Sequence, residues 1–147
     1  MRISYFIDTS ALFKRYVNEK GSSAVDRIFS DNNNKYISSL TIVEVISNLR
    51  RLVDVNKILT EEEFKIVAGS FLKDIKTGTI QVVEVKAPVI LKSMDLCAKR
   101  YITPMDALQL AAVLENPEEL IFVCSDKRLL SLAKEEGVDT LNPEESQ

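Results

Sequence analysis

The stretch Ile3-Ser4-Tyr5-Phe6-Ile7-Asp8-Thr9-Ser10-Ala11-Leu12 decides the fold, because an apolar run typical of a strand passes directly into a helical pattern. The polar residues of this stretch stand where the two patterns meet. Much later, the apolar run Leu120–Cys124 is followed by Ser125 and Asp126 and then by a second helical pattern. The repeated order of strand, polar step, acidic residue and helix is typical of folds in which strands and helices alternate.

The same two patterns extend over the rest of the chain. Strands are predicted at Ile3–Ile7, Ile80–Val85 and Leu120–Cys124, with weaker ones at Tyr36–Ser38 and Val138–Thr140, and helices at Ser10–Val17, Ser22–Ser30, Leu40–Val53, Glu61–Lys76, Val89–Arg100, Pro104–Glu115 and Lys127–Glu136. Strands separated by helices predict an α/β fold with a central parallel sheet of about four to five short strands, flanked by helices. The length of 147 residues suits one domain. We expect this domain to span residues 1–142, followed by a polar tail at residues 143–147.

The composition excludes several kinds of chemistry. The chain has no histidine, which excludes serine and cysteine triads, nucleases that depend on two histidines, and histidine-based zinc enzymes. Its two cysteines, Cys97 and Cys124, cannot complete a four-ligand zinc site, and we expect both to be reduced core residues. No glycine-rich loop follows a strand, so a dinucleotide fold or a phosphate-binding loop is not indicated. Acid–base or metal chemistry must therefore rest on carboxylates, hydroxyls and lysines.

Charge and hydropathy bear on partners and location. The formal net charge of −3 does not by itself indicate a nucleic-acid binder, whose usual footprint is basic. No apolar run approaches the ~20 residues that span a bilayer. Residues 1–7 lack the long apolar stretch and small-residue cleavage site of a secretory signal. These observations predict a cytoplasmic protein without a membrane partner.

Acidic residues at the carboxyl ends of the strands are candidates for a site, because ligands bind there in parallel α/β sheets. Asp8 and Asp126 directly follow predicted strands, and each opens a helix. Aspartate is also a favourable N-cap residue, and either Ser125 or Asp126 can cap the second helix. For both aspartates a cap and a functional carboxylate are therefore open interpretations.

Two further acidic residues lie on predicted helices. Glu44 lies in a polar strip, which on its own favours a solvent-exposed helix face. The opposite, apolar face is expected to consist of Ile42, Val43, Ile46, Leu49 and Val53. Asp106 lies in the first turn of a helix that is apolar nearly all round and is therefore expected to be buried. It can form a capping box with Thr103, or it can be held rigidly as a metal ligand.

Two of the four acidic residues are thus expected at strand ends, one in the first turn of a buried helix and one on the polar face of a helix. Carboxylates that lie close together raise one another's pKa unless a cation neutralises them. Mg²⁺ and Mn²⁺ favour ligand sets made of oxygen, and a chain without histidine offers no competing imidazole. The set Asp8, Glu44, Asp106 and Asp126 therefore indicates a divalent metal site.

The chain carries four segments that together resemble a known family: Ile7-Asp8-Thr9-Ser10-Ala11-Leu12, Thr41-Ile42-Val43-Glu44-Val45, residues 103–111 and residues 125–130. Over essentially its whole length it is similar to PIN-domain ribonucleases, most closely to the VapC-type toxins of VapBC toxin–antitoxin pairs. The resemblance implies a single PIN-like domain. Gln109 and Cys124 depart from it, since many relatives have histidine and threonine at these positions.

The resemblance implies a metal-dependent endoribonuclease that uses one or two Mg²⁺ or Mn²⁺ ions per site. The ligands would be Asp8 and Asp106, completed directly or through water by Glu44 and Asp126, and the supporting hydroxyls would belong to Thr9, Ser10 and Ser125. Hydrolysis by metal-activated water would leave a 5′-phosphate and a 3′-hydroxyl, and no side chain would be needed as the base.

Basic pairs accompany the acidic residues along the sequence. The pairs are Lys14-Arg15, Arg50-Arg51, Lys99-Arg100 and Lys127-Arg128. We hypothesise that some of them bind RNA phosphates, with Arg15, Arg51 and Lys127 as candidates, although scattered surface charges would give the same pattern. Unchanged salt dependence of RNA binding after Arg51→Ala or Arg15→Ala would contradict this hypothesis.

Other protein classes fit the residues less well. A haloacid-type phosphatase needs a second acidic residue two positions after Asp8, where the chain has Ser10, and a receiver domain needs an acidic pair at that strand end. A catalytically silent or free-standing PIN domain that binds RNA or protein stays open. The resemblance further implies an RNA substrate, a homodimer, and a cognate antitoxin that places a peptide in the acidic pocket.

Overall fold

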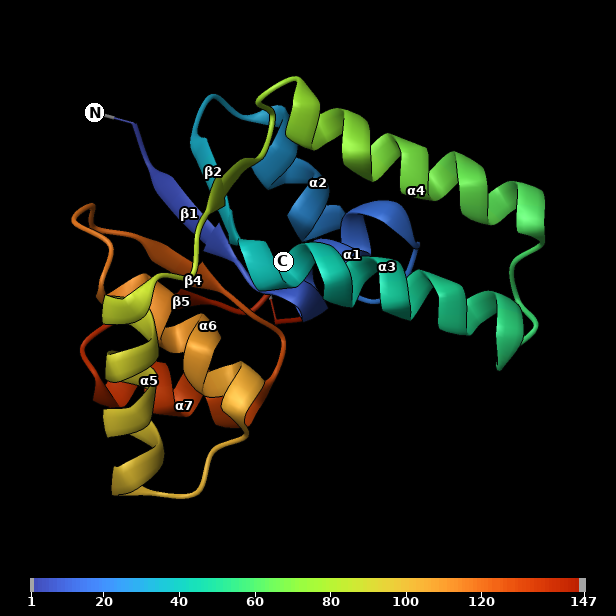
Figure 1. Ribbon diagram of the computed structural model, residues 1–147. Helices are drawn as coiled ribbons and strands as arrows, with labels where there is room; N and C mark the ends of the chain where they lie inside the picture. Colours follow the sequence, from blue (N-terminus) through green and yellow to red (C-terminus); the bar gives the residue numbers. More distant parts are fainter. Residues whose placement is uncertain (1, 146–147) are drawn as a thin grey trace.

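A computed structural model describes residues 2–145 of the chain (Figure 1). Within these residues the centre is a five-stranded sheet in which all neighbouring strands are parallel. In spatial order the strands are β3 (Gln81–Val83), β2 (Asn34–Ser38), β1 (Ser4–Ile7), β4 (Ile121–Val123) and β5 (Asp139–Leu141). The predicted α/β fold with a central parallel sheet is confirmed. Because the N-terminal strand lies in the middle, the residues that follow it stand at the centre of the carboxyl edge.

Seven helices connect these strands in the described part of the chain. They are α1 (Thr9–Tyr16), α2 (Ser22–Ser30), α3 (Ser39–Asp54), α4 (Glu61–Lys76), α5 (Ala87–Lys99), α6 (Pro104–Leu114) and α7 (Lys127–Glu135). Each predicted element is present, and α2 and α4 have the predicted bounds. Between residues 2 and 145 no helix has both the length and the apolar character needed to span a membrane.

Alternating side chains of the sheet supply two apolar layers, one on each face. Phe6 and Phe122 lie in one layer, with ring centroids 6.2 Å apart, together with residues of α5, α6 and α7. Ile7 and Ile37 lie in the other layer, together with residues of α1, α3 and α4. Figure 1 shows the two helix groups on opposite sides of the sheet. Since both faces are covered, polar chemistry is confined to the ends of the strands.

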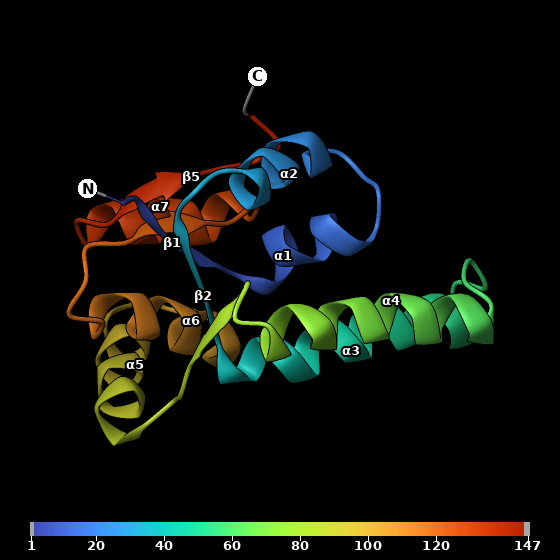
Figure 2. The ribbon, with the colours of Figure 1, turned by 90° about the horizontal axis from the view of Figure 1, so that it is seen from above.

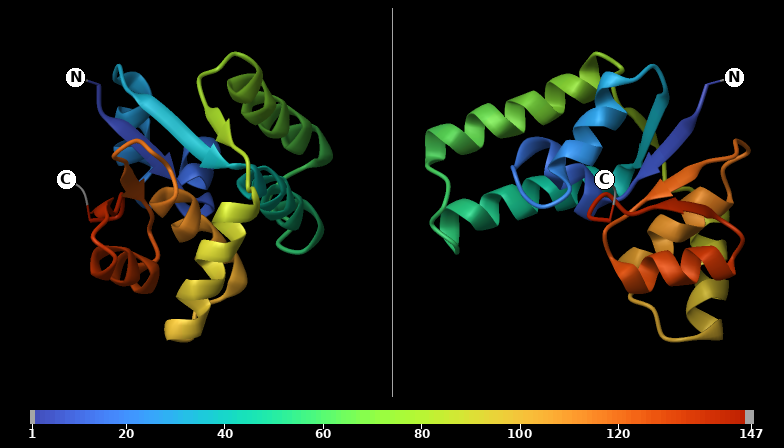
Figure 3. Two further views of the ribbon diagram at one scale, coloured as in Figure 1. Left: turned by 60° about the vertical axis from the view of Figure 1, so that its left-hand side comes forward. Right: turned by 180° about the vertical axis from the view of Figure 1, so that it is seen from behind.

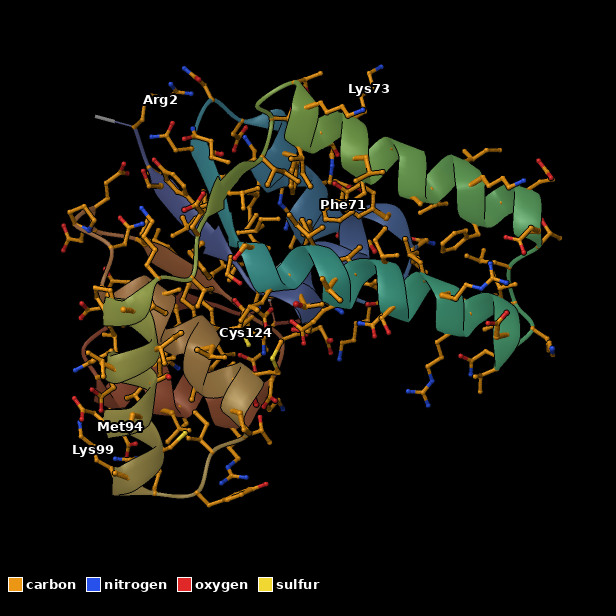
Figure 4. The ribbon with its side chains drawn as sticks, in the orientation of Figure 1. Arg2, Phe71, Lys73, Met94, Lys99 and Cys124 are labelled. Atoms are coloured by element: carbon orange, nitrogen blue, oxygen red, sulfur yellow. The ribbon has the colours of Figure 1, made fainter. Side chains whose placement is uncertain are left out.

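Helices α3 and α4 pack against each other and extend past the sheet (Figures 2 and 3). Helix α4 begins with a capping box, in which the Glu63 backbone N–H donates to Thr60 Oγ1 at 3.1 Å and the Thr60 N–H donates to Glu63 Oε1 at 2.9 Å. Phe71 of α4, labelled in Figure 4, is fully buried, and its ring lies 5.3 Å from that of Tyr16 in α1. This contact anchors the inner end of α4 to the helix that starts at the carboxyl edge.

Two expectations from the sequence are wrong. Helix α3 buries Thr41, Val45 and Leu49, whereas Val43, expected on the apolar face, is 71% exposed. The buried face is rotated because α3 packs mainly against α4 and α1. Cys97, expected in the core, is exposed on α5, while Cys124 is buried as expected; both thiols are free.

The segment expected to be a polar tail is partly packed against the domain. Pro143 is buried, and Glu144 Oε2 lies 2.9 Å from Lys14 Nζ in α1. Gly21 permits this approach: its φ is +91°, and a Cβ there would lie 3.1 Å from the carbonyl carbon of Pro143. The predicted tail at residues 143–147 therefore begins as an ordered contact, and its residues 146–147 lie outside the described part of the chain.

Candidate active site

The carboxyl ends of β1 and β4 lie side by side, and hydrogen bonds join the residues that follow them. The Asp8 backbone N–H donates to the Val123 carbonyl oxygen at 3.0 Å. Asp8 then caps α1, because its Oδ1 accepts from the Ala11 backbone N–H at 3.1 Å and from Ser10 Oγ at 2.8 Å. The Ser125 backbone N–H donates to Ser10 Oγ at 3.3 Å. The polar residues that follow β1 and β4 therefore lie next to one another.

Asp8 is buried at this edge without a basic partner. Its side chain is 6% exposed, and within residues 2–145 it forms no ion pair. The pKa of this carboxyl is raised to about 6, chiefly by burial and also by the negative charge of Asp106, against hydrogen bonds from Ser10 and Ala11. A buried carboxylate whose charge is not compensated is more typical of a functional site than of a structural pair.

Glu44 is joined to α1 and α6 by a network of hydroxyl and amide groups. Thr9 Oγ1 donates to Glu44 Oε1 at 2.5 Å, and Gln109 Nε2 donates to Thr41 Oγ1 at 2.7 Å. The same Nε2 lies 3.4 Å from both Thr9 Oγ1 and Glu44 Oε1. Thr9, Thr41 and Gln109 are buried and Glu44 is half-buried. The expectation of a solvent-exposed position for Glu44 is therefore wrong, because its carboxylate contacts the start of α1.

Thr41 and Gln109 carry no acidic group, and the sequence pattern did not identify them as site residues. Thr41 precedes Glu44 by three residues and Gln109 follows Asp106 by three, so each lies one helical turn from a candidate carboxylate. This spacing is the signal by which they could be found. Gln109 Oε1 is buried and accepts no hydrogen bond from the described residues, which leaves an unused acceptor beside the network.

Asp106 lies on α6 and Asp126 caps α7. Together with Asp8 and Glu44 they make up what we call the acidic edge of the sheet. Asp106 is half-buried, and burial raises its pKa, with a further contribution from the charge of Asp126. Of the two interpretations left open for Asp106, the capping box with Thr103 is not formed, since the Thr103 side chain makes no cap hydrogen bond; a hydrogen bond between the two side chains lowers the pKa of Asp106 in part. Asp126 is exposed and caps α7, because its Oδ1 accepts from two backbone N–H groups at 2.9 and 3.2 Å. Electrostatic repulsion thus couples Asp8 to Asp106 and Asp106 to Asp126.

The four carboxylates share this edge but do not form a closed cluster. In the described chain, residues 2–145, no three cysteine, aspartate or glutamate side chains are close enough to hold a metal ion as they stand. Glu44 and Asp126 each use one oxygen in the bonds above, and the second oxygen, Oε2 or Oδ2, accepts no hydrogen bond within those residues. Free carboxylate oxygens at the same edge as the buried Asp8 and the half-buried Asp106 suit Mg²⁺ or Mn²⁺ in their chemistry.

The candidate RNA-binding cations differ in how far they are already paired. Arg15 donates to Asp74 through Nε and Nη2, at 2.9 and 3.3 Å, and its guanidinium lies 4.0 Å from the Phe29 ring centroid. Arg51 is exposed and forms no ion pair with any residue of the described chain. The Lys127 side chain is 82% exposed, and its Nζ lies 3.9 Å from Glu145 Oε1. Arg51 and Lys127 are therefore accessible to a phosphate, whereas Arg15 is engaged within the fold.

Comparison with known proteins gives one family and several related folds. A model of the PIN domain matches residues 5–135, a span that contains all four candidate carboxylates. No curated protein matches the chain in sequence.

Three solved structures are similar over nearly the whole chain. FitAcB from Neisseria gonorrhoeae has a TM-score of 0.73 at 15% identity, with 97% of this chain and 99% of that chain covered. PAE2754 from Pyrobaculum aerophilum has a TM-score of 0.64 at 21% identity, with 98% and 93% covered. A toxin-antitoxin complex from Klebsiella pneumoniae has a TM-score of 0.61 at 16% identity, with 95% and 97% covered. At these identities the likeness shows a shared fold.

Proposed function

Because the chain belongs to the PIN domain family, we propose that it is a metal-dependent endoribonuclease that hydrolyses RNA phosphodiesters. The observation that carries the proposal is the buried Asp8, whose charge is opposed by that of Asp106 and is balanced by no basic side chain within residues 2–145. A divalent cation would supply the missing positive charge.

The residues that would hold one or two Mg²⁺ or Mn²⁺ ions are Asp8 and Asp106, completed directly or through water by Glu44 and Asp126. When bound, such an ion lowers the pKa of water and stabilises negative charge on the leaving oxygen. The contribution of the chain itself is to hold the carboxylates in position. Ser10 and the Ala11 backbone N–H hold one oxygen of Asp8, and Thr9 holds one oxygen of Glu44. These bonds reduce the freedom of both carboxylates before any ligand binds.

The test is cleavage of a labelled single-stranded RNA with Mn²⁺ or Mg²⁺, beside a reaction in EDTA. We expect Asp8→Asn and Asp106→Asn each to lower the cleavage rate roughly 100-fold or more, because a metal ion contributes several kcal/mol to transition-state stabilisation. The matched control is Glu118→Gln, an acidic residue at the amino end of the same sheet, which should leave the rate unchanged.

Cleavage that survives EDTA, or that survives in both aspartate variants, would contradict the proposal. Wild-type protein that is folded and binds RNA but does not cleave it would favour a second function, an RNA-binding or protein-binding PIN domain without catalysis. One observation favours that alternative: no three carboxylates are assembled for a metal in residues 2–145. Whether the wild-type protein cleaves RNA therefore decides between the two functions.

We further propose that the protein is the toxin of a type II toxin–antitoxin system and forms a homodimer. Support for an antitoxin comes from the similar fold of the Klebsiella pneumoniae toxin-antitoxin complex. Support for a protein partner comes from α5, where Ile90, Leu91 and Met94 are 52–60% exposed; Met94 is labelled in Figure 4. An RNA substrate and two free cysteines are in keeping with action in the cytoplasm.

Two measurements test these partners. Sedimentation should give a dimer that Leu91→Lys weakens, and a monomer at micromolar concentration would contradict the homodimer. Co-expression with the open reading frame beside the gene should yield a complex in which cleavage is inhibited. A complex that cleaves RNA as fast as the free protein would contradict the antitoxin proposal.

A further inference from the structure

Tyr101 is an aromatic residue that the fold leaves open to solvent beside the acidic edge. It lies in the loop between α5 and α6, and its side chain is 72% exposed. Arg128, near the start of α7, contacts it in two ways: its Nη2 donates to the Tyr101 carbonyl oxygen at 2.6 Å, and its Cζ lies 5.5 Å from the ring centroid. In Figures 1 and 3 the α5–α6 loop passes close to α7. Arg128 therefore holds both the backbone and the ring of Tyr101.

Arg128 also connects this aromatic residue to the candidate carboxylates. Its backbone N–H donates to Asp126 Oδ1 at 2.9 Å. Its side chain lines a small cavity together with Asp106 and Thr103. A single residue thus contacts Tyr101 on one side and borders two of the four carboxylates on the other.

The Tyr101–Arg128 pair contributes little to the stability of the fold. Both side chains are exposed, and a cation–π contact that is open to water stabilises a fold only weakly. The Tyr101 hydroxyl makes no hydrogen bond within residues 2–145, and the ring belongs to neither apolar layer. A ring that is held in place but not packed offers its surface to a ligand.

We propose that Tyr101 and Arg128 form a platform on which one base of a single-stranded RNA stacks, next to the acidic edge, where a divalent ion would hold a backbone phosphate. This inference rests on the proposed nuclease function and adds a specificity-determining contact to it. Unstacked bases bind to tyrosine rings and to guanidinium planes, and every base offers a face for such stacking. The positive charge of Arg128 would also attract the backbone phosphate beside that base. The platform selects single-stranded RNA, because a base within a duplex has no free face.

The experiment measures RNA binding and cleavage with a set of modified oligonucleotides. Binding of a labelled 12-nucleotide single strand is followed by fluorescence anisotropy in the Asp106→Asn background, so that the RNA stays intact. In a parallel set of oligonucleotides, one base at a time is replaced by an abasic site. Tyr101→Ala, Tyr101→Phe and Arg128→Lys are compared with Ile66→Ala, a matched control on α4 whose side chain is also 72% exposed.

We expect Tyr101→Ala to weaken binding roughly 5- to 160-fold, since stacking of one base contributes ~1–3 kcal/mol. Tyr101→Phe should bind like the parent, Arg128→Lys should fall between them, and Ile66→Ala should have no effect. One abasic position should weaken binding to the parent but cause no further loss in Tyr101→Ala. That non-additivity identifies the stacked base.

Four outcomes would overturn the platform, and they can be told apart. RNA binding and cleavage unchanged by Tyr101→Ala leaves the nuclease function intact and removes the platform. Equal weakening at every abasic position shows a general loss of affinity and not stacking. A changed oligomeric state with unchanged RNA binding assigns the exposed ring to a protein interface. If wild-type protein neither binds nor cleaves RNA, the proposed function itself fails, and the platform fails with it.

Discussion

Helix α1 has a buried ionisable residue at each end, and the two residues differ in whether an oppositely charged group lies beside them. Lys14, near its C-terminal end, is 4% exposed, and its Nζ lies 3.0 Å from Glu19 Oε1 and 2.9 Å from Glu144 Oε2. Burial alone lowers the pKa of Lys14, but hydrogen bonds to Glu144 and Glu19 outweigh it and raise the pKa. Asp8, at the N-terminal end, is 6% exposed, has no oppositely charged partner within residues 2–145, and has its pKa raised to about 6 by burial. The charge of Lys14 is compensated by two carboxylates of the chain, whereas the charge of Asp8 is compensated by no basic side chain among residues 2–145.

The two ends of the sheet repeat this contrast. At the amino end, the carboxylate of Glu118 accepts from Ser4 Oγ at 2.9 Å and from Tyr36 OH at 2.7 Å, and the Tyr36 bond chiefly lowers its pKa. At the carboxyl end, the pKa of Asp8 is raised. An acidic residue at a strand end is therefore not by itself a site. The lack of local charge compensation distinguishes the end of the sheet at which we propose the site.

The largest effect on the free energy of unfolding is expected when a divalent metal ion binds at Asp8. Mn²⁺ at 100 times its dissociation constant should raise the free energy of unfolding by about 2.7 kcal/mol, because it binds only the folded chain. Asp8→Asn should abolish this increase, which can be measured by thermal unfolding with and without the metal. Glu118→Gln should retain it. An increase that persists in Asp8→Asn would place the metal elsewhere.

Removing the two carboxylates that pair with Lys14 should have the next largest effect on stability. The double variant Glu19→Gln/Glu144→Gln should lower the free energy of unfolding by about 1–2 kcal/mol, less than for a fully buried pair because both carboxylates are partly exposed. Urea unfolding measures this loss. Cleavage per folded molecule should not change, since these residues lie outside the acidic edge. A fall in cleavage without a fall in stability would contradict the structural role of the pair.

The pH dependence of the metal-free protein should show the uncompensated charge directly. The pKa of Asp8 rises from 3.8 to about 6 on folding, so between these values the folded state binds a proton that the unfolded chain releases. The free energy of unfolding therefore falls as the pH rises through this window, by about 1–2 kcal/mol between pH 5 and pH 7.5. Urea unfolding of wild type and Asp8→Asn at both pH values measures it. An equal pH dependence in the two proteins would contradict the raised pKa.

The smallest effect is expected at the amino end of the sheet. Glu118→Gln replaces an exposed carboxylate that neighbouring hydroxyls already bond, so the unfolding midpoint should stay close to that of the wild type. Thermal unfolding across pH 5 to 7.5 provides the measurement. A midpoint shift as large as that of Asp8→Asn would remove the contrast between the two ends.

Much of the acidic edge could be predicted from local sequence. Asp8 and Asp126 directly follow apolar strands, and the carboxyl ends of parallel strands necessarily lie along one edge. Asp106 interrupts an otherwise apolar helix, and the burial of α6 follows from that pattern. These inferences succeeded because strand alternation and helical periodicity are properties of consecutive residues.

The sequence by itself determined the order of the elements, the parallel sheet and which acidic residues stand at its carboxyl edge. Only the tertiary structure decided which charges stay uncompensated. Arg15 is paired by Asp74, 59 residues away, and Lys14 by Glu144, 130 residues away. Likewise, Glu44 turns toward Thr9, and Arg128 holds Tyr101. Such contacts depend on which helix faces pack together, and periodicity within a segment carries no information about a partner in another segment.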